Sequence, residues 1–180
     1  ADPAILDSYG PERIPMVKRT AAEAYRNYER LRSTFERLAE VMAISGEGAA
    51  EQSRREALSR AIAIDLEPQW HSDGTVLDQR YEGSSIVPRE PGEASAYHSA
   101  RYQPLARPGH RAPMWRDAAG RPLYDRFGPE YTLLDMHDDA RPGAAFAEAL
   151  SAAGLPVTHV HLPEPALRQL YGSHLALIRP

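Results

Sequence analysis

A regular repeat of apolar residues dominates the first quarter of the chain. From Pro15 to about residue 44, apolar side chains recur at alternating spacings of four and three, and Arg and Glu fill the other faces. The members of the repeat are Val17, Ala21, Ala24, Tyr28, Leu31, Phe35, Leu38 and Met42. This spacing predicts one long amphipathic helix. The strict seven-residue repeat also fits a coiled-coil seam, so both interpretations stay open at this point.

Shorter helices are predicted on either side of the long one. Asp2 followed by Pro3 is typical of a helix start, and Gly10-Pro11 is expected to end that first helix. The glycines between Ser45 and Gly48 end the long helix. A second helix is then predicted from about Ala50 to Asp65.

The middle of the chain is less regular. Asp73-Gly74 is a turn signal with apolar residues on both sides, which predicts a small hairpin. The segment Glu90-Pro-Gly-Glu93 is typical of an exposed linker, so we place a domain boundary at about residue 93. An edge strand is predicted from Tyr97 to Tyr102.

The last third alternates between strand and helix patterns. Strands are predicted at Tyr131 to Met136, Val157 to Leu162 and Leu175 to Ile178, with a helix from Gly143 to Ala153 and one helical turn from Leu123 to Phe127. A strand, a helix and a strand with short links predict a parallel pair joined by a crossover helix. The fold class is therefore α/β, a helical segment followed by an α/β domain.

Charge and composition exclude several functions. The 180 residues carry a net charge of −4 without a basic block, which argues against a nucleic-acid partner. No apolar run approaches the roughly 18 to 20 residues of a membrane-spanning helix, so no membrane partner is expected. The chain has no cysteine, which excludes disulfides and thiol chemistry within it.

Three stretches carry a resemblance to a known family. The run "PGHRAPMW…GRPLYDRFGPEYTLLDM…LALIRP" resembles the C-terminal, thioredoxin-like domain of FAD-dependent aromatic hydroxylases of the phenol hydroxylase and 3-(3-hydroxyphenyl)propionate hydroxylase type. The opening "ILDSYGPERIPMVKR" resembles the helix entry that follows the flavin-binding part of the same family. Residues 79–88, here called the connector, resemble the family's segment between the helices and the last domain. The resemblance favours a long helix that lies against a flavin domain.

The resemblance implies a domain plan and a function. Residues 1–93 would be a helical region with a connector that packs on a flavin-binding domain, and residues 94–180 a thioredoxin-like domain without redox cysteines. Both ends are expected to be cut, because the family continues into a further strand and helix. The parent enzyme would hydroxylate a phenolic substrate with FAD, NAD(P)H and O2, in the cytoplasm and as a homodimer. This chain would supply its structural and dimerisation portion.

No catalytic, cofactor-binding or metal-binding residue is assigned to this chain from its sequence. The family binds FAD through G-x-G-x-x-G and Gly-Asp motifs that are missing here. Gly46 and Gly48 do not supply the first of these, because Glu51 stands where the third glycine is needed and the preceding element is a helix. FAD is therefore expected to bind to a part of the parent enzyme outside this chain.

Several polar residues are still candidates for chemistry, although a structural role is favoured for each. His159 and His161 point to one face of a strand, but a metal site needs a third ligand. The segment His137-Asp138-Asp139 follows a strand end, where α/β folds often place active sites. Arg80 and Tyr81 lie in the connector, where a tyrosine could face a substrate cavity, and Arg13 is expected to form a salt bridge or cap a helix.

A different class of function fits the same patterns. In this alternative, residues 15–44 form a coiled coil, and the thioredoxin-like part binds a partner without catalysis. A Ser-His-Asp hydrolase is a weaker hypothesis, because no G-x-S-x-G sequence is present.

Overall fold

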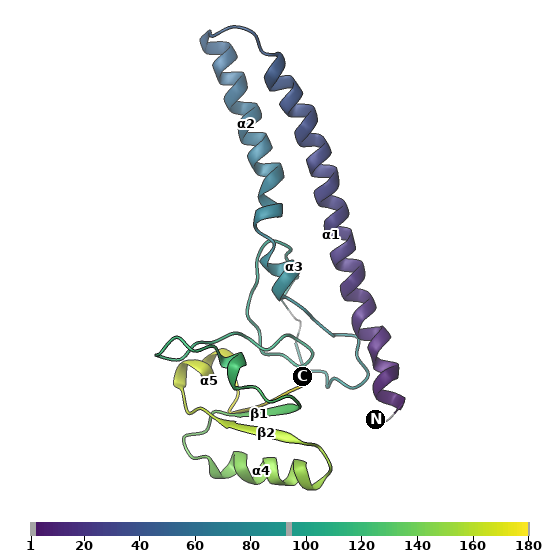
Figure 1. Cartoon of the computed structure of the whole chain (residues 1–180), viewed down its shortest axis with the longest axis vertical. Helices are drawn as coiled ribbons and strands as arrows, with labels where there is room; N and C mark the ends of the chain where they lie inside the picture. Colours follow the sequence, from purple (N-terminus) through teal and green to yellow (C-terminus); the bar gives the residue numbers. More distant parts are fainter. Residues whose placement is uncertain (1–2, 93–94, 180) are drawn as a thin grey trace. The chain divides into compact units, whose positions relative to one another are not determined.

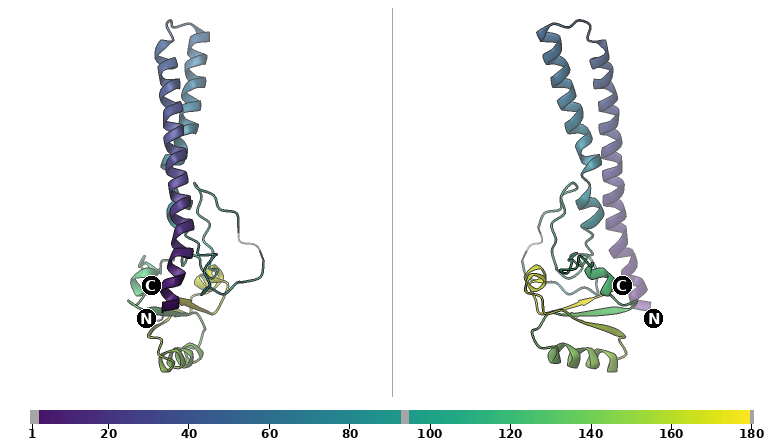
Figure 2. Two further views of the ribbon diagram at one scale, coloured as in Figure 1. Left: turned by 90° about the vertical axis from the view of Figure 1, so that its right-hand side faces the viewer. Right: turned by 60° about the vertical axis from the view of Figure 1, so that its left-hand side comes forward.

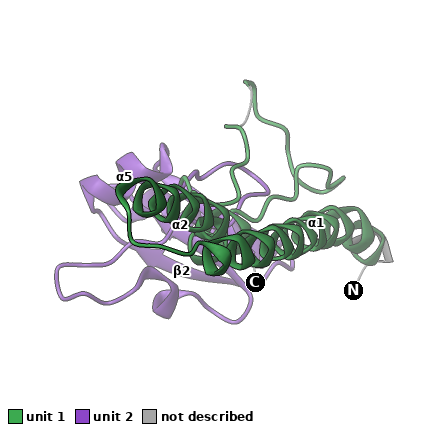
Figure 3. Ribbon diagram, turned by 90° about the horizontal axis from the view of Figure 1, so that it is seen from above, with its two compact units in different colours: residues 1–103 green, residues 104–180 purple. Residues whose placement is uncertain are grey.

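The computed structural model describes residues 3–92 and 95–179, which form two compact units (Figure 3). Unit 1 comprises residues 1–103 and unit 2 residues 104–180. The boundary predicted at residue 93 falls on residues outside the described part of the chain, so the predicted division stays a prediction. No helix among the described residues is long and apolar enough to cross a membrane.

Helix α1 is a single element that runs from Pro3 to Ala43, with Pro11 and Pro15 inside it. The prediction that Gly10-Pro11 ends a first helix was wrong. Proline removes one backbone hydrogen bond and is locally unfavourable, but tertiary contacts on this turn outweigh that preference. The buried Glu12 side chain accepts a hydrogen bond from the Ser84 hydroxyl at 2.5 Å.

Helix α2 spans Ala49–Trp70 and runs back alongside α1 as a helical hairpin (Figures 1 and 2). It continues past the predicted end at Asp65, and Asp65 itself contacts polar residues of α1. Ser33 donates to the Asp65 carboxylate at 3.1 Å, and Arg37 forms an ion pair with it.

Among the described residues, helix α1 buries only polar side chains. Its buried side chains are Ser8, Glu12, Glu23 and Thr34. The predicted apolar repeat from Val17 to Met42, here called the α1 stripe, is exposed along its whole length, and Phe35 is 61% exposed. Among the described residues of unit 1, no hydrophobic side chain is buried.

The segment after α2 differs from its prediction in two places. Asp73–Leu77 is the short helix α3 rather than a hairpin, and residues 97–102 form no strand. Gly74 is buried against the backbone of His98, and a Cβ atom at position 74 would overlap the His98 carbonyl oxygen. The Asp-Gly pair therefore marks a close backbone approach and not a hairpin turn.

Unit 2 contains a three-stranded mixed sheet. In chain order, its elements are η1 (Leu123–Arg126), β1 (Tyr131–Asp135), α4 (Arg141–Ala152), β2 (Val157–His161), α5 (Pro165–Tyr171) and β3 (Leu175–Ile178). The strand order is β2-β1-β3, in which β1 and β2 are parallel and β3 is antiparallel to β1. The predicted α/β class and the parallel pair are confirmed, and the arrangement is thioredoxin-like. Helix α5 was not predicted.

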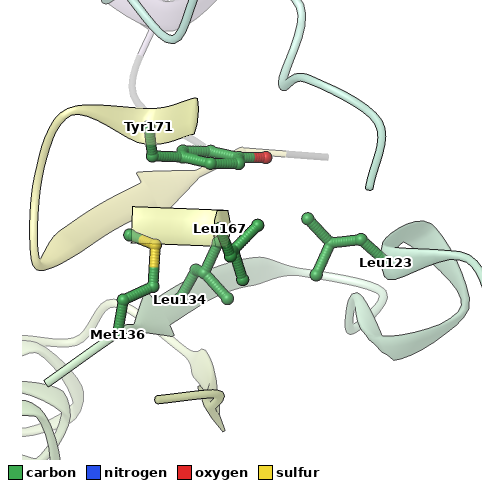
Figure 4. Packing of buried hydrophobic residues seen from close by; sticks show 5 residues of the cluster. All are labelled: Leu123, Leu134, Met136, Leu167 and Tyr171. Atoms are coloured by element: carbon green, nitrogen blue, oxygen red, sulfur yellow. The ribbon is translucent and has the colours of Figure 1, made fainter. Parts of the chain in front are cut away.

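The core of the chain lies on one face of this sheet. Leu134 and Met136 meet Leu167 and Tyr171 of α5, and Leu123 of η1 completes the cluster (Figure 4). Because side chains alternate along a strand, Leu133 and Asp135 point to the opposite face. Helix α4 lies on that side, with Gly143 directly against the Asp135 carboxylate.

Candidate functional site

The main polar cluster of unit 2 is centred on Asp135, the last residue of β1. Its side chain has no exposed surface. Oδ1 accepts hydrogen bonds from the His137 backbone N–H at 3.1 Å and lies 2.8 Å from His137 Nδ1. Oδ2 lies 3.1 Å from Nε2 of His159 on the parallel strand β2. The pairing of β1 with β2 thus brings two of the candidate histidines onto one carboxylate.

These contacts set the ionisation of Asp135. Burial by itself raises the pKa of a carboxyl group, but the hydrogen bonds from His137 and His159 outweigh it, so the pKa of Asp135 lies below its ordinary value. The group is therefore a buried carboxylate whose charge is stabilised by directed donors.

The other candidate residues around this cluster have structural partners. His161 Nε2 lies 2.9 Å from the His137 carbonyl oxygen, and the His137 ring stacks on His174 with centroids 5.0 Å apart. Asp138 pairs with Arg168 of α5, which lowers the pKa of that carboxyl group. Asp139 accepts hydrogen bonds from the side chain and the backbone N–H of Arg141 at the start of α4, and these bonds lower the pKa of Asp139.

The cluster is not arranged as a metal centre. In the described part of the chain, no group of three or more His, Asp or Glu side chains is placed to hold a metal ion. The inward nitrogens of His137 and His159 already face Asp135, and His161 faces a backbone carbonyl. The arrangement ties the ends of β1 and β2 together and fixes the orientation of the imidazole rings.

In unit 1, the candidate Arg80 lies in a buried ion pair with Asp78. Its Nε and Nη2 atoms donate to the two Asp78 oxygens at 2.7 and 2.5 Å, and Nη1 donates to the Ser95 carbonyl at 2.5 Å. The hydrogen bond to Asp78 raises the pKa of Arg80. This bidentate pair anchors the connector, and sequence reasoning missed Asp78.

Tyr81 and Arg13 meet each other. The Arg13 guanidinium lies 5.3 Å from the centroid of the Tyr81 ring and 5.7 Å from that of Tyr9. The structure therefore gives Arg13 aromatic neighbours where a salt bridge or a helix cap was expected. Arg13 and Tyr81 also line a groove along α1.

The starts of α2 and α4 do not fit the phosphates of FAD. A pyrophosphate needs free backbone N–H groups without nearby negative charge. Glu51 lies in the first turn of α2, against Gly48, and Asp139 binds the backbone N–H of Arg141 at the start of α4. Both starts present carboxylates, so no step of FAD chemistry is assigned to these residues.

Comparison with known proteins shows what the chain resembles. No family model matches it. It is 29% identical over 131 residues to the FAD-dependent monooxygenase opdD of Penicillium oxalicum, an alignment that covers 69% of this chain and 22% of that protein.

Solved structures match over the whole chain. The rebeccamycin biosynthetic enzyme RebC with reduced flavin matches with a TM-score of 0.74 and 25% identity, over 100% of this chain and 32% of RebC. The flavin-dependent monooxygenase PieE, in complex with FAD and substrate, shares the fold with a TM-score of 0.79 and 22% identity, over 36% of its length. The chain thus spans about a fifth to a third of the length of the proteins it matches.

Proposed function

We propose that this chain works as part of an FAD-dependent monooxygenase that hydroxylates a phenolic aromatic substrate with NAD(P)H and O2. The observation that carries the proposal is the match of the full chain to flavoenzyme structures at a TM-score of 0.74 and 25% identity. The sequence match to an FAD-dependent monooxygenase supports it independently. FAD supplies the reactive chemistry in such enzymes, and it would bind outside this chain.

The role proposed for this chain is structural. Its partner would be the FAD-binding part of the same enzyme, and the α1 stripe is the surface suited to that contact. Exposed apolar surface of this length is typical of an interaction site. Unit 1 buries no hydrophobic side chain among its described residues, so its apolar surface would be buried by contact with that partner. A homodimer and a cytoplasmic location complete the proposal.

The direct test is the intact mass and the visible absorption spectrum of the product of the intact gene. A flavin-dependent monooxygenase would be about three times as long as this chain, as the coverage of RebC indicates. Its purified form should show flavin absorption at about 375 and 450 nm, and NAD(P)H oxidation should increase when a phenolic substrate is added. A colourless product of 20.0 kDa would contradict the proposal.

The exposed stripe also favours one other function. If the seven-residue repeat pairs with a helix of another protein, the chain is a non-catalytic interaction module with a coiled-coil helix and a thioredoxin-like binding domain. In that case, the 20.0 kDa product should form a helical complex through residues 17–42 without flavin. Substitution of Leu31 and Leu38 by Glu should abolish that complex.

A further inference from the structure

A groove in unit 1 has the composition of a small-molecule site. Its volume is about 440 Å³, within the range of ligand pockets. Met16, Val17 and Ala21 of α1 lie along it, and Thr75 of α3 and Tyr81 of the connector line it as well. Apolar surface therefore predominates, with a few hydroxyl groups and one aromatic ring.

The groove exists because the α1 stripe changes in size along the helix. Its members next to α3 include the small residues Ala21 and Ala24, whereas its far half carries Tyr28, Phe35 and Met42. Alanine side chains leave room between α1 and the connector that larger residues would fill. The space is large enough to admit one or two aromatic rings with a short substituent.

One cation is available at the end of this groove. The Arg13 guanidinium lies over the rings of both Tyr9 and Tyr81, 5.7 and 5.3 Å from their centroids, and no carboxylate among the described residues pairs with it. Contact with aromatic faces leaves the planar N–H donors of arginine available for a carboxylate. Two tyrosine faces also hold the guanidinium in place, which lowers the ordering cost of such a contact.

The other end of the groove is polar, and its one carboxylate is paired with an arginine. A smaller neighbouring groove of about 210 Å³ shares Thr20, Ala24 and Thr75 with the first. It is lined in addition by Asn27 and Ser99, and by Glu23, whose charge is paired with Arg26 at 2.5 Å. The trough thus runs from a cation, over an apolar floor, to hydroxyl and amide groups and a carboxylate that is already paired.

We propose that this trough binds an aromatic monocarboxylate, with the carboxylate on Arg13 and the ring over Met16, Val17 and Ala21. Arg13 is the one cation among the described residues that line the groove. One positive charge beside apolar surface matches one negative charge on an apolar body, and it is a poor match for a multiply charged phosphate. The inference goes beyond the monooxygenase proposal. It uses the Val17 and Ala21 end of the α1 stripe, so the contact proposed with the FAD-binding part applies to the rest of the stripe, from Tyr28 to Met42. An acidic segment of another protein is the competing occupant.

The test is a calorimetric titration of the 180-residue chain with 2-naphthoate. Saturable one-to-one binding is expected. Arg13→Gln should weaken it about tenfold or more, the loss of one charge-assisted contact. The matched control is Arg32→Gln, because Arg32 is an exposed arginine of α1 that pairs with Glu29 and does not line the groove. It should bind like the parent chain.

Two further measurements separate ring recognition from plain anion binding. Ala21→Leu fills the floor at an exposed helix position without a change of charge, so it should also weaken binding about tenfold while helicity stays constant. Neutral 2-naphthalenemethanol should bind at least about tenfold more weakly than 2-naphthoate. The proposal is overturned if no saturable binding occurs, if Arg13→Gln and Ala21→Leu bind like the parent chain, or if acetate competes as well as 2-naphthoate.

Discussion

At Asp135, a negative charge lies where apolar packing would otherwise continue from Leu133 and Leu134. Its two oxygens serve three donors, from the backbone and ring of His137 and the ring of His159. Asn at this position would keep the shape but present an NH2 group to one of those donors. We expect Asp135→Asn to lower the unfolding free energy by about 1–3 kcal/mol.

Urea unfolding followed by Trp115 fluorescence measures this effect in unit 2, with Trp70→Phe as the background. The matched control is Asp138→Asn, whose side chain is 82% exposed, and its cost should stay below about 1 kcal/mol. An equal loss for both variants would show that burial of Asp135 is unimportant.

The lowered pKa of Asp135 also predicts a pH dependence. A carboxylate whose folded pKa lies below its unfolded value stabilises the fold above that unfolded value, ordinarily about 3.9. The stabilisation is lost as the pH falls through the lower folded pKa. The urea concentration at the unfolding midpoint should therefore fall when the pH is lowered below about 4. Over the same pH range, the difference in midpoint between the parent chain and Asp135→Asn should shrink. A constant difference from pH 6 to pH 2 would contradict this assignment.

Gly143 gives a third prediction beside the same carboxylate. Alanine normally improves a helix by about 0.5–1 kcal/mol relative to glycine. A Cβ atom at position 143 would overlap the Asp135 side chain, so Gly143→Ala should destabilise unit 2 instead. The control is Gly10→Ala in α1, where the new Cβ would meet Ile14 at an ordinary 3.8 Å. If Gly143→Ala raised the urea midpoint of unit 2, the close packing of α4 on Asp135 would be refuted.

Only part of this cluster was predictable from sequence. The alternation of a strand was enough to place His159 and His161 on one face, and the position of His137 after a strand followed from the apolar run. Asp135 was missed, because its role depends on the register that sets it opposite His161 and on the absence of a side chain at Gly143. Both are tertiary facts that local spacing does not contain.

At the scale of elements, α1 illustrates that a periodic pattern can predict a helix without predicting which side of that helix is buried. The period of the α1 stripe identified the helix, but it did not indicate that the helix would bury its polar side within unit 1. That choice comes from Ser84 and Asp65, which lie far along the chain and pair with Glu12, Ser33 and Arg37. The end predicted at Gly10-Pro11 failed for the same reason, and the short helix α5 has too few turns for a clear period.

The exposed stripe leads to a fourth prediction, a contrast between two apolar truncations. Leu134 is fully buried in unit 2, so Leu134→Ala should cost about 2–5 kcal/mol. Phe35 is 61% exposed, so Phe35→Ala should cost less than about 1 kcal/mol in this chain. Circular dichroism during urea unfolding measures both. A large loss for Phe35→Ala would mean that the stripe is already covered, for instance by self-association.

For the whole molecule, the two units differ in what stabilises them. Every buried hydrophobic side chain among the described residues belongs to unit 2, whereas unit 1 relies on polar contacts between its helices and connector. Burial of each leucine contributes about 1.5–3 kcal/mol, and a typical hydrogen bond contributes about 1 kcal/mol net. Unit 1 should therefore open locally at a lower free energy than unit 2.

Native-state hydrogen exchange of the 180-residue chain tests this difference. The amides of Leu133 and Leu134 should exchange at least about a hundredfold more slowly than those of residues 28–38, because they require opening of the packed sheet. Equal protection in α1 and β1 would show that unit 1 is stable without further cover. It would also remove one support for the proposal that the α1 stripe packs on the FAD-binding part of a monooxygenase, while the match to flavoenzyme structures would be unaffected.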